Sequence, residues 1–597
     1  MAEALLTALG LTDARRMDGL VTSHRFPAEA CLMAEGSVGD ACYLVVEGEI
    51  RVEVTRADFD SDGVVGYVGP GELCGEFSLL DRTPRSASAY AHTDVVVRRL
   101  SADGLRALCR DDPAAGLQVV LALGRNAATR ARQYAKHLQQ FVFGDEVDAS
   151  VDRTVAAARA AQESFEAWPE DKIDGLVAAV AEAVAARAGP LAADTVAETG
   201  VGNAADKTRK NRFASLDVAA SLIGKVGTGV WGTDDARGVT EIAAPSGVIL
   251  GLVPMTNPVS TLVFKSLICL KSRNALIASV HHAARGVGAD TATLIRQVLT
   301  DHGAPADLLQ ALPGRGTRRR TAMYMGHPSV SLVLATGGPG MVKAAYSSGT
   351  PAIGVGSGNA PAWICDDADV AAAARTVIDS KSFDHGVICG SENNLVVDSA
   401  VRARFDEALE LSGAAVLDAS EKARLTVHAF DEHGLSRRVL GQSAASIAAT
   451  CGIVRQHPLR LLVAPTDLGE VDGPWGREKL APLLSLFTVA GEDEAMAVCL
   501  RLLGNGGTGH TAVVHTPDEQ RQRRYGLAMP ASRILANAPA AQGCIGLGNG
   551  LTPSLTLGCG TFGGNSTTDN VSYTNLVNVK RMAGPLRAPA GAGGKDT

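Results

Sequence analysis

The chain has 597 residues, of which 46% are hydrophobic, 20% are charged and 65 are glycines. This length exceeds what one core usually organises, so we expect several domains, and the glycine content suits the tight turns and close backbone approaches of α/β folds. The formal net charge of -8 argues against a nucleic-acid partner, because phosphate binding needs a basic face, and it favours small-molecule chemistry.

The cysteine pattern indicates a reducing compartment, and the N-terminus shows no targeting signal. The 11 cysteines are scattered without a CxxC pair, which is typical of reduced thiols, so we expect no disulfide framework and no metal site. Residues 1–19 have no basic region before their apolar stretch and no small-residue cleavage site, and no apolar run elsewhere reaches membrane-spanning length without Gly, Pro or charge. We therefore expect a cytoplasmic protein without signal peptide or membrane anchor.

Residues 25–100 alternate apolar and polar positions between glycine-rich turns, which predicts an antiparallel β structure, closed by helices over residues 101–140. Within it, residues 71–89 (GELCGEFSLLDRTPRSASA) place an acid and an arginine around a turn. Arg85 can form paired hydrogen bonds with phosphate oxygens, and Glu76 can accept from a sugar hydroxyl. The alternative is a solvated surface pair worth under about 1 kcal/mol.

In its context, this segment resembles the phosphate-binding cassette of the cyclic-nucleotide-binding domain family, over about residues 20–140. The resemblance implies that Glu76 holds the ribose 2'-hydroxyl and Arg85 the cyclic phosphate, with Ser86 and the Gly75 backbone nearby. Ser86 in place of threonine favours cAMP over cGMP. A cassette that keeps the fold without binding is the alternative. A transcription factor of the cAMP-receptor type is disfavoured, because no basic recognition helix follows the predicted long helix.

From residue 148 to 228 the pattern is alanine-rich and amphipathic, and from about residue 240 strands alternate with helices, as in a doubly wound α/β sheet. Residues 239–253 (VTEIAAPSGVILGLV) are interpreted as strand. Asn257, in the turn that follows, is a candidate oxyanion donor, a role worth about 3 to 4 kcal/mol, although alone it is only a turn residue. A further strand ends at a glycine turn whose backbone N–H groups can approach a pyrophosphate. This turn contains Thr336, Gly337, Gly338, Pro339 and Gly340.

Cys389 lies in a loop (SKSFDHGVICGSENN) ahead of a predicted strand and is followed by small residues. Such a cysteine can reach a substrate while backbone donors lower its pKa, as a thiolate nucleophile requires. The alternative, which fits most of the 11 cysteines, is an inert small hydrophobic residue.

The order of these pieces resembles the aldehyde dehydrogenase superfamily over about residues 148–583. The segments that carry the likeness are VPMTNP, FKSL, KSRNA, TGGPGMVKAAYSSG, AIGVGSGN, GVICGSE, GGTGHT and LGCGTFGGNS. Together they look like the acylating half of the bifunctional aldehyde-alcohol dehydrogenases. The sequence ends without the iron-dependent alcohol dehydrogenase half, so we expect the reaction to stop at the aldehyde.

The resemblance implies that Cys389 attacks the aldehyde, that Asn257 and the Cys389 N–H hold the oxyanion, and that hydride passes to a nicotinamide. Hydrolytic members activate water with a glutamate in an ELGGK segment, whereas the matching residues 354–358 hold no acid. This favours release by CoA, a nucleophile that needs less base help than water. His510 in GGTGHT matches a histidine of the acylating group and is expected to help deprotonate CoA or, alternatively, to make a structural hydrogen bond.

The resemblance also implies cofactor contacts. Glu478 in REKLAP matches the family's glutamate that holds the nicotinamide ribose. Residues 278–282 (ASVHH) replace the family's KPSE segment, which binds the adenosine ribose, so NAD is expected and NADP stays open. The family's cofactor turn is matched by Thr336, Gly337, Gly338 and Gly340.

These observations predict a multidomain chain. We expect a β-roll with flanking helices over residues 1–144, an α/β aldehyde dehydrogenase fold over residues 145–583, and a disordered tail over residues 584–597. The second part would comprise a Rossmann-like cofactor domain at about 145–360, a catalytic α/β domain at about 361–545, and a small region at 546–583 that returns to the cofactor domain and serves oligomerisation.

The expected reaction interconverts a short aldehyde, CoA and NAD(P) with an acyl-CoA such as acetyl-CoA, in a homodimer or homotetramer regulated by a cyclic nucleotide. A hydrolytic aldehyde dehydrogenase and a non-enzymatic cyclic-nucleotide sensor are the alternatives. The aldehyde stays open, with acetaldehyde, propanal and sulfoacetaldehyde as candidates.

Overall fold

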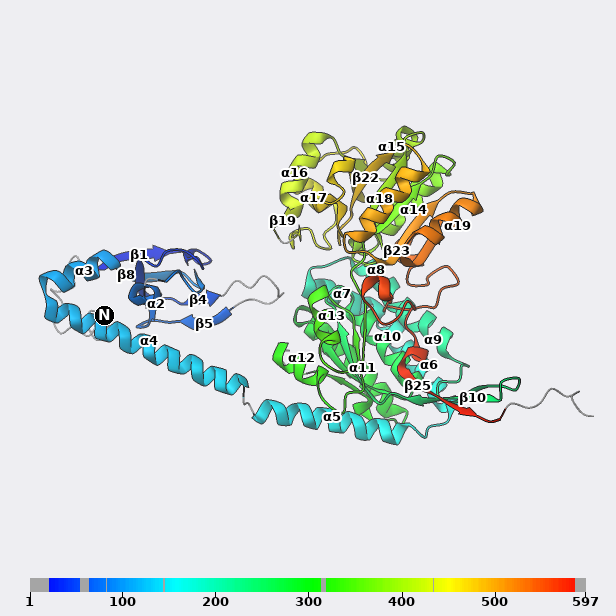
Figure 1. The fold of residues 1–597 in the computed structure, drawn as a ribbon, viewed down its shortest axis with the longest axis horizontal. Helices are drawn as coiled ribbons and strands as arrows, with labels where there is room; N and C mark the ends of the chain where they lie inside the picture. The colour runs from blue at the N-terminus through cyan, green and yellow to red at the C-terminus, as the bar shows by residue number, and fades with distance from the viewer. Residues whose placement is uncertain are drawn as a thin grey trace, which may run out of the picture. The chain divides into compact units, whose positions relative to one another are not determined.

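The computed structural model describes residues 21–53, 64–81, 83–142, 145–312, 318–432 and 434–585. The chain divides into two compact units, 1–146 and 147–597, and each is described by itself (Figure 1). Most of the tail expected to be disordered, residues 586–597, lies outside the described residues.

The first unit is a β-roll of two four-stranded antiparallel sheets, in the orders β1-β8-β3-β6 and β2-β7-β4-β5. One core cluster lies between the strands, and a second packs beneath the helices α3 and α4. The α/β pattern of the second unit is absent from the described part of this one. The elements are β1 Val21–Phe26, β2 Cys31–Met33, β3 Ala41–Glu47, β4 Ile50–Glu53, β5 Val64–Val68, β6 Leu73–Cys74, α2 Glu76–Asp81, β7 Ser88–Ala91, β8 Val95–Ser101, α3 Ala102–Asp111 and α4 Pro113–Val142.

The second unit contains a five-stranded parallel sheet in the order β13-β12-β11-β14-β15. Its central strand β11 is buried at every position, as expected for a strand covered on both faces. The strands are β11 Val248–Val253, β12 Ala275–Val280, β13 Leu309–Ala311, β14 Leu332–Ala335 and β15 Ala352–Gly354. The helices that accompany this sheet are α5 Asp145–Phe165, α6 Glu170–Ala186, α7 Ala188–Thr199, α8 Ala204–Arg212, α9 Val218–Leu222, α10 Pro258–Lys271, α11 Arg285–Asp301, α12 Arg318–Met325 and α13 Pro339–Tyr346.

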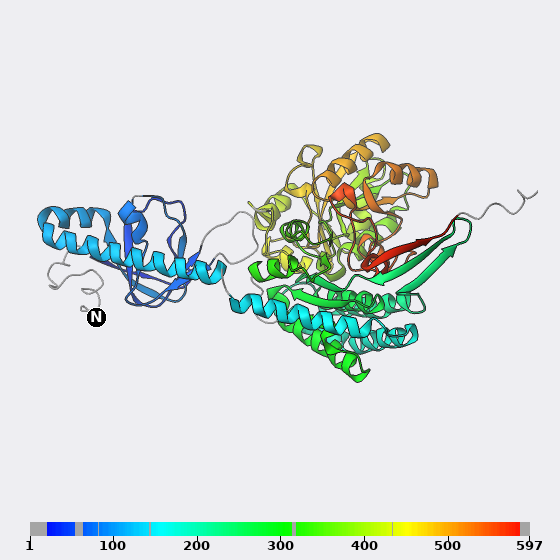
Figure 2. The same cartoon turned by 60° about the horizontal axis from the view of Figure 1, so that its bottom comes forward.

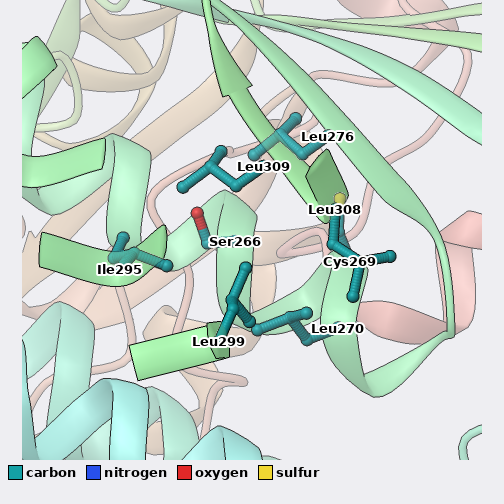
Figure 3. Close-up of a pocket in the computed structure, with 8 residues that line it drawn as sticks. All are labelled: Ser266, Cys269, Leu270, Leu276, Ile295, Leu299, Leu308 and Leu309. Carbon is teal, nitrogen blue, oxygen red and sulfur yellow. The ribbon is translucent and has the colours of Figure 1, made fainter. Parts of the chain in front are cut away.

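Helix α10 is buried along its whole length, and its Lys265 joins two strands of this sheet. The Lys265 ammonium donates to the carbonyls of Leu252 on β11 (2.6 Å) and Leu334 on β14 (2.7 Å). Because burial penalises the charged form, the pKa of Lys265 falls to about 7. Eight side chains, including Ser266, Cys269 and Leu270 of α10, enclose a small apolar void with no room for a water molecule. This void is a feature of core packing and not a ligand site (Figure 3).

A seven-stranded parallel sheet in the order β18-β21-β22-β17-β16-β23-β24 forms the other part of this unit. Its strands are β16 Ala360–Ile364, β17 Glu392–Asp398, β18 Ala414–Val416, β21 Leu461–Pro465, β22 Leu483–Val489, β23 Gly509–His515 and β24 Ala531–Ala536. Its helices are α14 Val370–Lys381, α15 Arg402–Leu411, α16 Ala419–Ala429, α17 Ala444–Thr450, α18 Glu492–Gly504, α19 Glu519–Ala528 and α20 Ala540–Gly543, and a short hairpin joins β19 Phe430–Asp431 to β20 Gly434–Leu435.

The segment 239–253, expected as strand, is two strands in two different sheets. The break falls at Ser246 and Gly247, where the glycine takes a left-handed φ of 119°. Before the break, β10 Val239–Pro245 is the middle strand of a three-stranded antiparallel sheet with β9 Gly229–Asp234 and β25 Val577–Ala583 (Figure 2). After it, the chain enters the parallel sheet as β11.

No single helix in the described part of the chain is long and apolar enough to cross a membrane. One bent pair, Glu170–Ala186 with Ala188–Thr199, meets that length and composition together.

Candidate active site and nucleotide site

Cys389 lies in the loop that connects α14 to β17. Three consecutive residues ahead of it, Asp384, His385 and Gly386, take left-handed φ values of 47°, 53° and 75°. Since only glycine adopts this region readily, two non-glycine residues there mark a turn held by its surroundings. The turn brings the Cys389 Sγ to 3.2 Å from the Nε2 of His510.

His510 is fully buried near the start of β23, and its Nδ1 lies 2.9 Å from the Thr511 hydroxyl. Burial, and then the nearby Arg533, hold the pKa of His510 well below its usual range. The resting imidazole is therefore neutral, and its Nε2 lies within hydrogen-bonding distance of the Cys389 sulfur. Sequence reasoning assigned this histidine to CoA, and the structure brings it to the nucleophile.

The thiol of Cys389 is not activated in the resting protein. Burial, together with Glu478 and Cys559, raises its pKa to about 12 against the opposing effects of Arg533 and of a backbone hydrogen bond at Cys389. A backbone donor thus acts in the expected direction, but burial outweighs it. Although part of the Cys389 side chain is accessible, protein atoms surround the thiol and remove the water that would stabilise a thiolate.

The loop of residues 355–359 lies directly on the nucleophile loop. A Cβ atom added at Gly358 would stand 1.7 Å from the Cys389 carbonyl oxygen, so only glycine fits there. The Gly358 N–H donates to the Glu478 carboxylate over 3.2 Å. The Cys389 carbonyl therefore leaves no space for a side chain at Gly358.

Glu478 lies next to the nucleophile within a network of buried lysines. Burial raises its pKa to about 7, while the Gly358 N–H, Lys381 and Lys479 act in the opposite direction. Burial in turn lowers the pKa of Lys381 to about 7. The expected contact of Glu478 with a nicotinamide ribose stays a prediction.

Asn257 ends the loop after β11, directly before α10 begins at Pro258. Its Oδ1 accepts a hydrogen bond from the ammonium of Lys210. Its Nδ2 lies 3.3 Å from the Thr256 hydroxyl and 3.4 Å from the Val387 carbonyl, two residues before Cys389. These are long hydrogen bonds, so the amide N–H faces the nucleophile loop without being strongly engaged there.

Apolar side chains form a cluster that Cys389 packs against. Its buried members are Phe213, Phe383, Ile388, Ala541, Cys544, Ile545 and Leu557, and partly buried Leu547 and Leu555 adjoin them.

A cleft of about 540 Å³ opens on the side of helix α13. Its volume lies in the range of ligand pockets, and its lining follows α13 from Pro339 to Ser347. The predicted turn residues Thr336, Gly337, Gly338 and Gly340 lie between β14 and α13 but outside the residues that line the cleft, whereas Pro339 lines it. The cleft is lined by Pro339, Val342, Lys343, Tyr346, Ser347, Gly356, Ser357, Gly506, Thr508, Phe562, Gly563, Gly564 and Asn565.

The first unit brings its expected ligand residues together. Glu76, the first residue of α2, is fully buried, and Arg85 is only 5% exposed, so the alternative of a solvated surface pair is wrong. The Arg85 guanidinium donates to the carbonyls of Gly75 (2.7 Å) and Ala41 (2.5 Å). Gly75 has a φ of 85°, and a Cβ there would stand 2.5 Å from Arg85. Ser86 is exposed.

Sequence reasoning missed the buried charges around the nucleophile, namely Lys207, Lys210, Asp384 and Arg533. Lysines in a polar helix such as ADKTRKN usually lie on a solvated face, and their burial could not be recognised locally. Among the described residues, no group of three or more His, Cys, Asp or Glu side chains could hold a metal ion.

Comparison with protein families identifies the family of each part of the chain. The model of the aldehyde dehydrogenase family matches residues 137–550, and that of the cyclic nucleotide-binding domain matches residues 23–112. The chain therefore belongs to the aldehyde dehydrogenase family and carries a cyclic nucleotide-binding domain before the dehydrogenase part. The resemblance to these two families seen in the sequence is confirmed.

Individual relatives point to the acylating members of the family. The chain is 39% identical over 440 residues to the bifunctional aldehyde-alcohol dehydrogenase AdhE of Escherichia coli, a match that covers 73% of this chain and 49% of that protein. It is 37% identical to an acylating sulfoacetaldehyde dehydrogenase of Cupriavidus necator, covering 73% and 89%. The crystal structure of an acetylating aldehyde dehydrogenase from Geobacillus thermoglucosidasius superposes with a TM-score of 0.72 at 40% identity, covering 74% and 98%. The chain thus spans about half the length of the bifunctional relative.

Proposed function

We propose that this protein is a CoA-acylating aldehyde dehydrogenase, which converts an aldehyde, CoA and NAD(P) into an acyl-CoA and the reduced cofactor. The observation that carries the proposal is the 3.2 Å contact between the Cys389 thiol and the neutral His510, beside a segment, residues 354–358, that holds no water-activating acid. The relatives and the family match support it.

The first step adds the Cys389 sulfur to the aldehyde carbon. The thiol proton moves to the Nε2 of His510, and the carbonyl oxygen gains negative charge, which the Asn257 amide and the Cys389 N–H stabilise. When bound, the nicotinamide cofactor supplies the acceptor for the hydride that leaves the aldehyde carbon. Cys389 then carries the acyl group as a thioester.

The second step moves the acyl group from Cys389 to the sulfur of CoA. The proton that His510 took from Cys389 is released to solvent after hydride transfer, so His510 Nε2 is again in position to take up the proton of the CoA thiol. The Cys389 thiolate is the leaving group, and it regains a proton from His510. A thiol needs far less base assistance than water, so the step proceeds without a carboxylate at residues 354–358. Glu478, Thr336, Gly337, Gly338 and Gly340 are proposed to contact the cofactor.

The decisive experiment measures NADH formation from acetaldehyde and propanal with and without CoA, together with the product. We expect a CoA-dependent steady rate and acyl-CoA as the product. Formation of the free acid at the same rate without CoA would contradict the proposal and favour a hydrolytic enzyme.

The substrate is proposed to be an aldehyde with a short uncharged chain. The cluster beside Cys389 offers seven buried apolar side chains and suits acetaldehyde or propanal, whereas the nearby Arg533 cation, which a sulfonate would need, is already engaged by the carbonyls of Gly509 and Gly558. A kcat/KM for sulfoacetaldehyde above that for propanal would contradict this assignment.

NAD is expected as the cofactor because the chain resembles the bifunctional aldehyde-alcohol dehydrogenases. Parallel assays with NAD and NADP decide between the two cofactors.

The first unit is proposed to bind a cyclic nucleotide and to regulate the enzyme. The buried Glu76 and Arg85 and the family match at residues 23–112 support binding, and the fusion of the two units in one chain supports regulation. Calorimetry with cAMP and cGMP tests binding, and an activity titration tests regulation. A flat activity response to a nucleotide that binds would contradict the regulatory part.

The cytoplasmic location and the homodimer or homotetramer stay predictions.

A further inference from the structure

Two buried lysines lie one turn apart on helix α8. Lys207 is 3% exposed and Lys210 is 2% exposed, although a lysine ammonium is costly to remove from water. Burial, and then the neighbouring Lys210, lower the pKa of Lys207 to about 8. Two buried ammonium groups are stable only if their hydrogen-bond acceptors compensate the cost of burial. The acceptors therefore show which parts of the site the lysines hold in place.

On one side, both lysines bind the same carboxylate, that of Asp384. The Lys207 ammonium donates to Asp384 Oδ2 over 3.0 Å, and Lys210 donates to the same oxygen. Asp384 is fully buried and sits in the left-handed turn five residues ahead of Cys389. Its Oδ1 accepts from the Asn203 N–H over 2.8 Å. The carboxylate thus fixes the start of the nucleophile loop.

On the other side, the same two ammonium groups hold the turn that carries the oxyanion donor. Lys207 donates to the carbonyl of Thr256 over 2.8 Å, and Lys210 donates to the side-chain Oδ1 of Asn257. Because Lys210 occupies the oxygen end of the amide, the Nδ2 end is turned toward the Val387 carbonyl and the nucleophile loop. Asn257 therefore cannot reverse its amide without placing an N–H against an ammonium group.

We infer that Lys210 is a positioning residue for the acylating reaction, which orients the Asn257 amide and polarises it so that its N–H stabilises the oxyanion more strongly. A cation on the amide oxygen strengthens donation from the amide nitrogen, because polarisation runs along a chain of hydrogen bonds. The inference rests on the proposed function, since it assigns Lys210 to the oxyanion of that reaction.

The arrangement has a second consequence for charge. Two ammonium groups share one carboxylate at this position, which leaves excess positive charge next to the oxyanion donor. Preorganised positive charge of this kind stabilises developing negative charge without further reorganisation. A lysine with only a structural role would need neither the second ammonium group nor the contact with the amide oxygen.

The test is a double-mutant cycle on the rate of hydride transfer in a single turnover. Lys210→Met is expected to lower this rate by about tenfold to a hundredfold with little change in aldehyde KM, because it weakens an oxyanion donor. In an Asn257→Ala background the same substitution is expected to change the rate by less than about twofold, since Lys210 acts through that side chain.

A matched control is Lys271→Met. Lys271 is also fully buried and also bound to two acceptors, the carboxylates of Glu170 and Asp174, but it lies at the far end of α10 from Asn257. It is expected to lower the thermal midpoint while the folded enzyme keeps its hydride-transfer rate. If Lys210→Met does not fold, Lys210→Gln replaces it in the cycle, because a glutamine removes the charge and keeps a donor.

Equal rate losses from the Lys210 substitution with and without Asn257, or no loss at all, would overturn the positioning role. A wild-type enzyme that makes NADH over many turnovers without CoA would instead overturn the proposed function, and the cycle would then report on the hydrolytic reaction. The two failures are therefore distinguishable in one set of assays.

Discussion

The two ligand sites of this chain use charge in opposite ways. In the nucleotide cassette, the charged side chains Glu76 and Arg85 are buried, and the guanidinium is held by two backbone carbonyls. At the candidate active site, Cys389 and His510 are in contact, and burial keeps both of them neutral. A site that receives a preformed anion keeps a permanent cation, whereas a site that must create an anion keeps a neutral proton donor and acceptor until the substrate arrives.

The largest effect should come from removing the thiol. Cys389→Ala is expected to lower CoA-dependent NADH formation by on the order of 10⁴-fold or more, because no other group forms the acyl intermediate. Cys451→Ala, a buried cysteine in another core cluster, serves as the control and should keep the wild-type rate. Comparable losses in both variants would mean that the effect is structural.

The pH dependence of thiol reactivity tests the neutral pair directly. With a pKa of about 12, Cys389 in the resting protein is almost entirely protonated at pH 7. Its alkylation rate should therefore rise about tenfold for each pH unit between pH 7 and pH 10, since only the thiolate reacts. The measurement is iodoacetamide labelling followed by mass spectrometry of the Cys389 peptide. A labelling rate that is already constant from pH 7 would mean that the thiol is ionised in the resting protein. Cys389 would then carry a permanent charge, as Arg85 does.

The cassette side of the comparison is tested by Arg85→Ala. Loss of paired, charge-assisted hydrogen bonds to a phosphate should weaken cyclic-nucleotide binding by about tenfold to a hundredfold. Isothermal calorimetry on the full chain measures the change. Arg99→Ala, which removes an exposed pair with Asp40 on the same unit, is the control for the charge change. Unchanged binding in Arg85→Ala would mean that this arginine only supports the fold.

The smallest effect concerns stability. The pKa of Lys265 falls from its usual 10.5 to about 7 on folding, so between these values the unfolded chain binds more protons than the folded one. Stability should therefore rise with pH across this window and be lost as the pH falls toward 7, by up to about 1.4 kcal/mol per pH unit for one proton. Lys265→Met should reduce this slope in thermal midpoints measured from pH 7 to pH 10. An identical slope in both proteins would contradict the shift.

The sequence predicted the two classes of site better than it predicted their electrostatics. Segments such as GVICGSE and GELCGEF mark Cys389 and Glu76 because turn geometry and ligand chemistry demand particular residues at short spacing. The direction of the Cys389 pKa could not be predicted, since it depends on protein atoms that distant segments bring around the thiol. The division of residues 239–253 between two sheets was hidden for a similar reason, because both halves carry strand patterns and only tertiary pairing separates them.

The contact at Gly358 also limits how this enzyme can change over evolution. A single methyl group at that position would collide with the carbonyl of the catalytic cysteine, so no substitution there can add a water-activating side chain without moving the nucleophile loop. Any side chain at Gly358 would therefore require the backbone of Cys389 to move as well, so the two loops can change at this point only together.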